Sequence, residues 1–123
     1  MGLGDPIGLV EVVARGVDMF DCVLPTRYAR HGTVFTTNGR LNLRNSKFAT
    51  DDRPLDPDFP ASPAASWSRA YLRHLLLIQE PTAQRLLTLH NLAWLLDFVA
   101  RIRRSISEGH FASLREETLE VWS

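Results

Sequence analysis

Asp21 is the residue of this chain whose type and position are best suited to chemistry. It closes a short apolar run, and Pro25 and Arg27 follow it in the next six residues. A carboxylate at the carboxyl end of a buried strand can act as a nucleophile or a base, and nearby arginines can hold an anionic substrate. The simpler alternative is that Asp21 caps a strand end or forms a salt bridge with Arg27. Residues 18–27 therefore predict either a carboxylate active site or an ordinary strand end.

A basic segment follows this carboxylate in a chain whose formal net charge is zero. No acidic residue occurs from Cys22 to Thr50, whereas the basic side chains there are Arg27, Arg30, Arg40, Arg44 and Lys47, with His31 among them. Total charge offers no support for a nucleic-acid partner, but a local basic segment predicts a phosphate-binding surface. The alternative is an ordinary solvated face.

With 123 residues, the chain is long enough for one modest domain. Its hydrophobic fraction of 45% is typical of a globular protein. The single cysteine, Cys22, allows no disulfide within the chain, which is typical of a reducing compartment. The first five residues lack the charged and apolar regions of a signal peptide, and no apolar stretch is long enough to span a bilayer. We therefore expect a cytoplasmic protein with no membrane partner.

The elements that must position these residues begin with a helix followed by a strand. Asp5-Pro6 predicts a helix start, and Gly16 predicts its end. Residues 17–23 have the pattern of a short buried strand. Asn38-Gly39, in the middle of residues 34–43, predicts a hairpin, because Asn-Gly supplies the positive φ angles that a two-residue turn needs.

The second half of the chain is expected to be helical after a Pro-rich loop over residues 51–63. The expected helices run from Ser66 or Ser68 to about Gln79, from Pro81 to Ser107 before Gly109, and from about Ala112 onward. The apolar middle of the second helix predicts deep packing. A lone buried strand and a hairpin leave backbone groups without ladder partners. This set of elements is therefore typical of one end of a larger domain.

Motifs in a fixed order along nearly the whole chain resemble one enzyme family. They are Met1-Gly2-Leu3-Gly4, residues 16–27, Leu41-Asn42-Leu43-Arg44-Asn45, residues 68–75, His90-Asn91-Leu92 and Ser105-Ile106-Ser107-Glu108-Gly109. With these motifs the chain closely resembles the C-terminal third of tRNA-guanine transglycosylase, also called queuine tRNA-ribosyltransferase. The segment around Asp21 is the most specific of them.

The resemblance implies an α/β fold class: the C-terminal fragment of a (β/α)8 barrel with an inserted zinc-type subdomain, mostly helical. Residues 1–23 would be the last barrel unit, residues 24–80 the hairpin and degenerate zinc subdomain, and residues 81–123 the C-terminal helices. The family is a pentosyltransferase of queuosine biosynthesis. It exchanges the wobble guanine of tRNA for a 7-deazaguanine without a redox cofactor.

The resemblance also implies roles for individual residues. Asp21 would be the nucleophile that attacks the ribose C1′, so that a covalent RNA intermediate forms and the configuration is retained. Met1 and Gly2 would line the base pocket. The tRNA-binding segment would be Thr26, Arg27, Tyr28, Ala29 and Arg30, whose arginines suit phosphates and whose tyrosine suits a stacked base.

The chain departs from the family at the zinc site. The family pattern of three cysteines and a later histidine falls on Phe59, Ala61, Ala64 and His90. One imidazole cannot hold a structural zinc ion, which needs four nitrogen or sulfur ligands. We therefore predict no zinc and no other cofactor, a small apolar cluster of the first three residues, and a packed or hydrogen-bonded His90.

A second departure concerns the barrel, because the resemblance begins where the seventh barrel strand ends. The groups that orient the base would then be supplied elsewhere, and this chain alone is expected to be inactive. Apolar side chains such as Leu9, Val13 and Phe20 would be exposed, which favours a homodimer or the missing N-terminal part of the enzyme as partner. The alternative is a non-catalytic module, derived from the enzyme, that binds RNA or serves as a dimer partner. The tRNA anticodon loop is the expected substrate contact.

Overall fold

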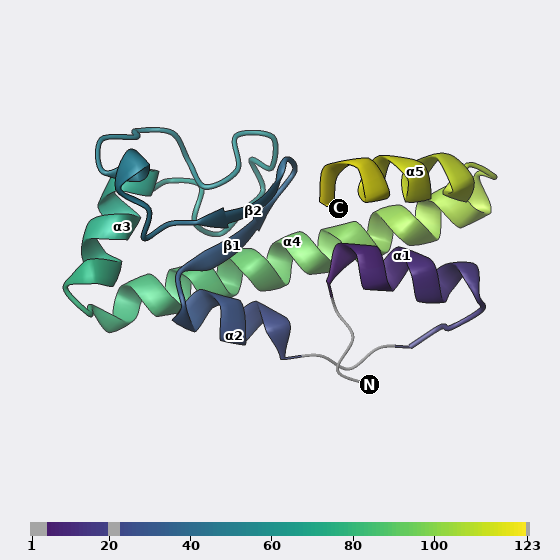
Figure 1. Cartoon of the computed structure of the whole chain (residues 1–123), viewed down its shortest axis with the longest axis horizontal. Helices are drawn as coiled ribbons and strands as arrows, with labels where there is room; N and C mark the ends of the chain where they lie inside the picture. The colour runs from purple at the N-terminus through teal and green to yellow at the C-terminus, as the bar shows by residue number, and fades with distance from the viewer. Residues whose placement is uncertain (1–4, 20–22, 123) are drawn as a thin grey trace. The chain divides into compact units, whose positions relative to one another are not determined.

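The computed structural model describes residues 5–19 and 23–122, so Met1, Gly2 and Asp21 lie outside the described residues. The described part of the chain is mostly helical with one small sheet, as Figure 1 shows. Its elements are α1 (Pro6–Ala14), α2 (Leu24–Arg30), β1 (Thr33–Thr36), β2 (Gly39–Asn42), η1 (Ser46–Phe48), α3 (Arg69–Leu77), α4 (Pro81–Ser107) and α5 (Phe111–Trp122). Among these helices, none has the length and apolar character needed to cross a membrane.

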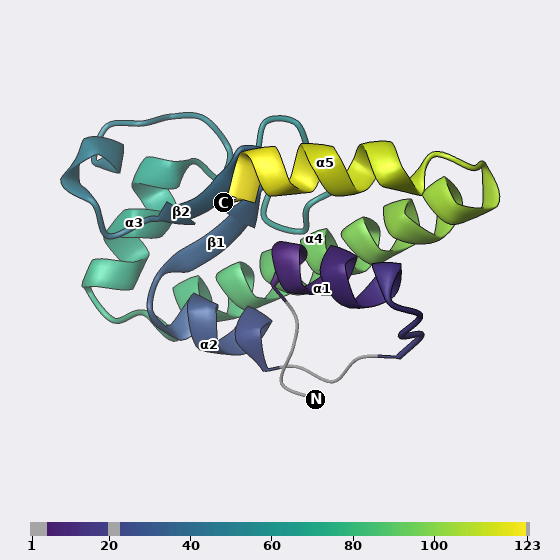
Figure 2. The same cartoon turned by 45° about the vertical axis from the view of Figure 1, so that its right-hand side comes forward.

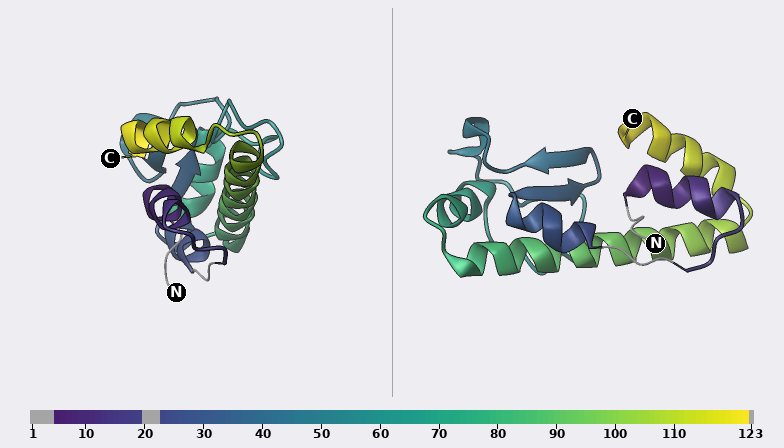
Figure 3. Two further views of the ribbon diagram at one scale, coloured as in Figure 1. Left: turned by 90° about the vertical axis from the view of Figure 1, so that its right-hand side faces the viewer. Right: turned by 60° about the horizontal axis from the view of Figure 1, so that its bottom comes forward.

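The chain divides into two compact units. The first consists of residues 1–24 and 95–123, and the second of residues 25–94. Helix α4 contributes residues to both, and Figure 3 shows its full length. The origin of either unit in a barrel stays a prediction from the family resemblance.

The predicted helix boundaries are confirmed, because local caps determine them. The Asp5 carboxylate accepts a hydrogen bond from the Gly8 N–H at 3.0 Å, and Gly16 ends α1 with φ 93°. The Ser68 hydroxyl accepts from the Tyr71 N–H at 3.0 Å and starts α3. Gly109 has φ 78° between α4 and α5. Left-handed glycines are the usual helix stops, because they adopt this conformation without steric cost.

The predicted strand over residues 17–23 is wrong for the part that the structure describes. Residues 17–19 and residue 23 belong to no strand, and Met19 is 87% exposed. Residues 24–30 form helix α2, in which Pro25 occupies the first turn, where its missing N–H costs nothing. An apolar run becomes a strand only where a neighbouring strand completes its ladder, and the described residues offer none here.

The predicted hairpin is present, but its turn lies one residue earlier than expected. Thr36 pairs with Gly39, so Thr37 and Asn38 form the two-residue turn. Gly39 has φ 112°, whereas Asn38 is not among the residues with positive φ. The carboxylate of Asp56 sets this turn, because it accepts from both the N–H and the hydroxyl of Thr37, at 2.7 and 2.9 Å. A residue distant in sequence therefore decided the register.

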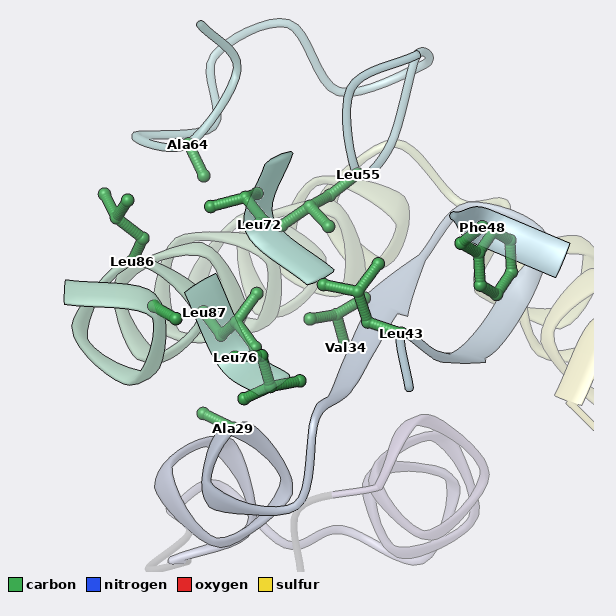
Figure 4. Packing of buried hydrophobic residues seen from close by; sticks show 11 residues of the cluster. Ala29, Val34, Leu43, Phe48, Leu55, Ala64, Leu72, Leu76, Leu86 and Leu87 are labelled. Atoms are coloured by element: carbon green, nitrogen blue, oxygen red, sulfur yellow. The ribbon is translucent and has the colours of Figure 1, made fainter. Parts of the chain in front are cut away.

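The second unit is built around one apolar cluster (Figure 4). Val34 and Leu43 of the hairpin meet Leu72 and Leu76 of α3 and Leu87 of α4 there, and each of the five is at most 6% exposed. The buried side chains are Ala29, Val34, Leu43, Phe48, Leu55, Ala64, Leu72, Leu76, Ala83, Leu86 and Leu87. Burial of the valine, leucine and phenylalanine side chains is worth about 1.5–3 kcal/mol each, so this cluster holds the helices and the hairpin together.

In the first unit α1 packs against α5, and the two helices lie side by side in Figure 2. The Arg115 guanidinium donates two hydrogen bonds to the Glu11 carboxylate, at 2.7 and 3.0 Å. Leu9 is only 1% exposed, so its predicted exposure is wrong. Helix α1 packs against another helix of the same chain, α5. The prediction of deep packing along α4 is also too broad, because Leu96 on that helix is 69% exposed.

Candidate functional site

The predicted tRNA-binding segment, residues 26–30, lies on helix α2. Thr26, Arg27 and Arg30 are exposed, whereas Ala29 is completely buried in the apolar cluster. In the described part of the chain, neither Arg27 nor Arg30 forms an ion pair. Ala29 therefore anchors the helix, and the two arginines present their guanidinium groups to solvent.

Tyr28 of the same segment takes part in an aromatic row. Its ring lies 5.5 Å from the ring of Phe35, which stacks at 5.5 Å on Trp94. Its hydroxyl accepts a hydrogen bond from Arg40 Nη1 at 3.3 Å. Tilted and stacked aromatic pairs add about 0.5–1.5 kcal/mol beyond their burial, so the first role of Tyr28 is to pack α2 against β1.

The remaining basic residues predicted from the sequence are also exposed. They are His31, Arg40, Arg44 and Lys47. Arg40 and Lys47 line a groove of about 440 Å³ beside the hairpin, together with Arg53, Arg69, Asp51 and Asp56. Four cations and two carboxylates leave this groove positive overall. Two residues of the basic segment, Arg40 and Lys47, thus lie in a groove of net positive charge.

Asp51 forms ion pairs with two of these cations. Arg53 Nε and Nη2 donate to the Asp51 carboxylate at 3.1 and 2.9 Å, and Arg69 Nη1 donates at 3.0 Å. Hydrogen bonds from Arg53 and, after it, from Arg69 hold the pKa of Asp51 well below its usual range, although partial burial opposes them. Arg69 is 7% exposed and also donates to the carbonyls of Pro54 and Leu55, at 3.0 and 3.1 Å. It therefore holds the Pro-rich loop on the start of α3.

His90 and Asn91 of α4 together bind strand β1. His90 Nε2 donates to the Phe35 carbonyl at 2.8 Å, and the Asn91 side-chain oxygen accepts from the Phe35 N–H at 3.0 Å. Asn91 Nδ2 also donates to the carbonyls of Thr33 and Pro25, at 3.0 and 3.1 Å. Both residues are completely buried. Their side chains bind backbone groups of Phe35 and Thr33 on β1, as a third strand beside β1 would otherwise do.

The second nitrogen of His90 is occupied as well. Because a carbonyl can only accept, Nε2 carries the proton, and Nδ1 accepts from the Ser62 hydroxyl at 2.6 Å. Burial lowers the pKa of His90, because it disfavours the charged imidazolium. The hydrogen bond to the Phe35 carbonyl and the charge of Asp56 act in the opposite direction but are weaker. The prediction of a packed, hydrogen-bonded histidine is confirmed.

The residues at the positions that the resemblance assigns to zinc do not fit a zinc ion. The half-buried Phe59 ring and the His90 ring lie in a T-shaped arrangement, with ring centroids 6.1 Å apart, and Ala64 is completely buried. Ala61 is exposed, so the predicted apolar cluster does not include it. None of the three side chains can ligate a metal, and the described residues hold no group of three or more His, Cys, Asp or Glu side chains that could.

Four residues with large structural roles were missed as site residues in the sequence: Asp56, Ser62, Arg69 and Asn91. Arg69 and Asn91 lie within the motifs that identified the family, but no pattern of spacing assigns their partners. Asp56 accepts from Thr37, from the Asp58 N–H at 3.0 Å and from Trp94 Nε1 at 3.2 Å. Such long-range partners leave no periodic signal in the sequence.

The family model for queuine tRNA-ribosyltransferase matches residues 1–123. Curated relatives with that name include the protein of Caulobacter vibrioides, 51% identical over 117 residues that cover 95% of this chain and 32% of the relative. The Desulforudis audaxviator protein is 55% identical over 97% of this chain and 32% of its own length. The Bacillus subtilis protein is 48% identical over 98% of this chain and again 32% of its own. The chain therefore spans about a third of the length of these relatives.

Proposed function

This chain belongs to the queuine tRNA-ribosyltransferase family of pentosyltransferases, and we propose that it is the part of such an enzyme that supplies the nucleophile and a surface for tRNA. The observation that carries the proposal is the match along the whole chain at about 50% identity. In this role it takes part in the exchange of wobble guanine for a 7-deazaguanine in the cytoplasm.

The proposed nucleophile is Asp21. Its carboxylate attacks the ribose C1′, the bond to guanine breaks, and the leaving base takes up a proton. The incoming base then loses a proton, attacks the same carbon and expels the carboxylate, so that two inversions retain the configuration. The hydrogen bond from Asn91 to the Pro25 carbonyl supports the proposal, because it holds the start of the helix that follows Asp21 by a few residues.

The proposed tRNA surface consists of the exposed arginines Arg27 and Arg30 on α2. Guanidinium groups bind phosphate bidentately and keep their charge at every physiological pH. Ala29 and Tyr28 fix the helix that carries them, through burial and through the contact with Phe35. We propose that these arginines contact the phosphates of the anticodon loop.

By itself the chain should bind RNA without catalysis, because positioning of the reacting base contributes much of the rate in such reactions. The partner that completes the site would be the rest of the enzyme, or a second copy of this chain in a dimer. The alternative function, a non-catalytic RNA-binding module, is favoured by one observation: three of the family's four metal-ligand positions hold Phe59, Ala61 and Ala64.

The decisive experiment measures labelled-guanine exchange into tRNA by the purified chain, alone and mixed with the N-terminal two thirds of a relative. We expect no exchange alone and exchange in the mixture, with Asp21→Asn abolishing the latter. Exchange by the isolated chain that Asp21→Asn abolishes would overturn the claim of inactivity. A mixture that binds tRNA but never exchanges guanine would favour the alternative module.

The RNA surface is tested separately by binding of an anticodon stem-loop at several salt concentrations. The double variant Arg27→Ala/Arg30→Ala should weaken binding and lower the salt slope by roughly 1–2, since each phosphate contact contributes about 0.7–0.9. Arg103→Ala/Arg104→Ala is the matched control, with two exposed arginines on α4. Equal loss in both double variants would mean that binding is not localised to α2.

A further inference from the structure

We propose that Ser62 and His90 form a hydrogen-bonded bracket that replaces the metal ion of the family, so that this subdomain folds without zinc and does not take it up. The inference rests on the contacts of His90, Ser62 and Phe59. It goes beyond the proposed function, since it concerns how the loop over residues 59–64 is held on α4 and not what the chain does to tRNA.

The bracket joins the same chain segments that a metal ion bound at these positions would join. The resemblance places three ligands at Phe59, Ala61 and Ala64, and the fourth at His90 on α4. Ser62 lies between the second and third of these positions. Its hydroxyl donates to His90 Nδ1 at 2.6 Å, so one hydrogen bond ties the loop to the helix. The Ser62 oxygen also accepts from the Ala64 N–H at 3.1 Å, which orients the hydroxyl toward the ring.

His90 continues the bracket to the hairpin through its other nitrogen, which donates to the Phe35 carbonyl at 2.8 Å. Loop, helix and strand are therefore connected through one imidazole. The ring is completely buried, Ser62 is 8% exposed, and Phe59 packs on the imidazole in a T-shaped arrangement. Hydrogen bonds are strong in such a dry environment, and leaving one partner unpaired is costly.

The bracket also opposes metal binding. A zinc ion needs the lone pair of a ring nitrogen, but Nε2 carries a proton and the lone pair of Nδ1 is occupied by the Ser62 hydroxyl. Binding would break the hydrogen bond to Ser62 and would find a phenyl ring and two methyl groups where thiolates are needed. Ser62 is thus the residue that makes the loss of the cysteines tolerable.

The test uses the purified 123-residue chain produced in zinc-supplemented medium. We expect far less than one zinc per chain by elemental analysis, and a Tm that neither EDTA nor added zinc changes. Ser62→Ala should lower the Tm by roughly 5 °C or more, which is the scale for one buried polar group that loses its partner in a domain of this size. Ser66→Ala, an exposed serine of the same loop, is the matched control and should leave the Tm unchanged.

The reverse experiment installs the missing ligands. The triple variant Phe59→Cys/Ala61→Cys/Ala64→Cys has three thiols in the family spacing next to His90, and it should purify with about one zinc per chain and lose Tm on EDTA treatment. Adding Ser62→Ala to this variant should strengthen zinc binding, because the hydroxyl no longer competes for the lone pair of Nδ1; an affinity that does not rise would contradict the claim that the bracket opposes metal binding. Imidazole ¹⁵N shifts of the unaltered chain give a readout that needs no variant, with His90 expected as the Nε2–H tautomer.

Three results would overturn the proposal: one zinc per chain in the unaltered protein, a Tm that falls with EDTA, or a Ser62→Ala variant as stable as the Ser66→Ala control. Cys22 lies outside the described residues, so Cys22→Ser is measured in parallel. A zinc content that disappears in Cys22→Ser would show a thiol-based site instead of the bracket.

Discussion

Truncation of Asn91 is expected to destabilise the second unit more than any single change on its surface. Asn91→Ala removes one acceptor and two donors at once, because the side chain accepts from the Phe35 N–H and donates to the carbonyls of Thr33 and Pro25. The side chain is completely buried, so water cannot replace these bonds without opening the packing.

The expected loss in the free energy of unfolding depends on whether each hydrogen-bond partner of Asn91 can find another partner. The Phe35 N–H donates to the Asn91 side-chain oxygen, so removal of this acceptor costs about 1–3 kcal/mol, the penalty for a buried polar group that loses its partner. The carbonyls of Thr33 and Pro25 each lose one bond, worth about 0.5–1.5 kcal/mol. Together these amount to roughly 2–6 kcal/mol, a large share of the 5–15 kcal/mol that is typical of a whole domain.

The assay is urea unfolding followed by far-UV circular dichroism and by tryptophan fluorescence, because Trp94 stacks on Phe35 beside the lost bonds. Asn38→Ala in the exposed hairpin turn is the matched control and should change the free energy of unfolding by less than about 0.5 kcal/mol. A loss below about 1 kcal/mol for Asn91→Ala, with an unchanged m-value, would refute the view that this residue replaces a missing strand.

Two further predictions concern the charged and titratable groups of the same unit. Burial lowers the pKa of His90, so the unfolded chain binds more protons than the folded chain near pH 6; stability should be complete above about pH 6.5 and fall as the pH drops below it. Urea midpoints between pH 5 and 8 check this, and His90→Gln should flatten that part of the profile. Arg69→Lys should cost about 2–4 kcal/mol in urea unfolding, because a single ammonium group cannot reach Asp51 and the carbonyls of Pro54 and Leu55 together. A lysine variant as stable as the original chain would mean that solvent replaces these bonds freely.

Features that depend on neighbouring residues could be predicted from the sequence. Asp5 and Ser68 cap helices through their own side chains, and Gly16 and Gly109 end helices because glycine tolerates positive φ. The exposure of the arginines on α2 followed from a basic segment without acids. Each of these inferences needs only a few adjacent residues.

Features that depend on distant partners could not be predicted. The turn of the hairpin shifted by one residue, because Asp56 binds both polar groups of Thr37. The apolar pattern of residues 17–23 predicted a strand, although a strand also requires a neighbour to accept its hydrogen bonds. Leu9 was expected to be exposed, but α5 covers the helix that carries it.

The sequence by itself determined the family, the caps of the helices and the carboxylate proposed as the nucleophile, because ordered motifs and local hydrogen bonds are encoded in adjacent residues. Only the tertiary structure showed that His90 and Asn91 bind the edge of β1, and that Ser62 occupies the free nitrogen of His90. The physical reason is that a buried polar group takes whichever partner the packing brings within reach, and that partner can lie anywhere in the chain.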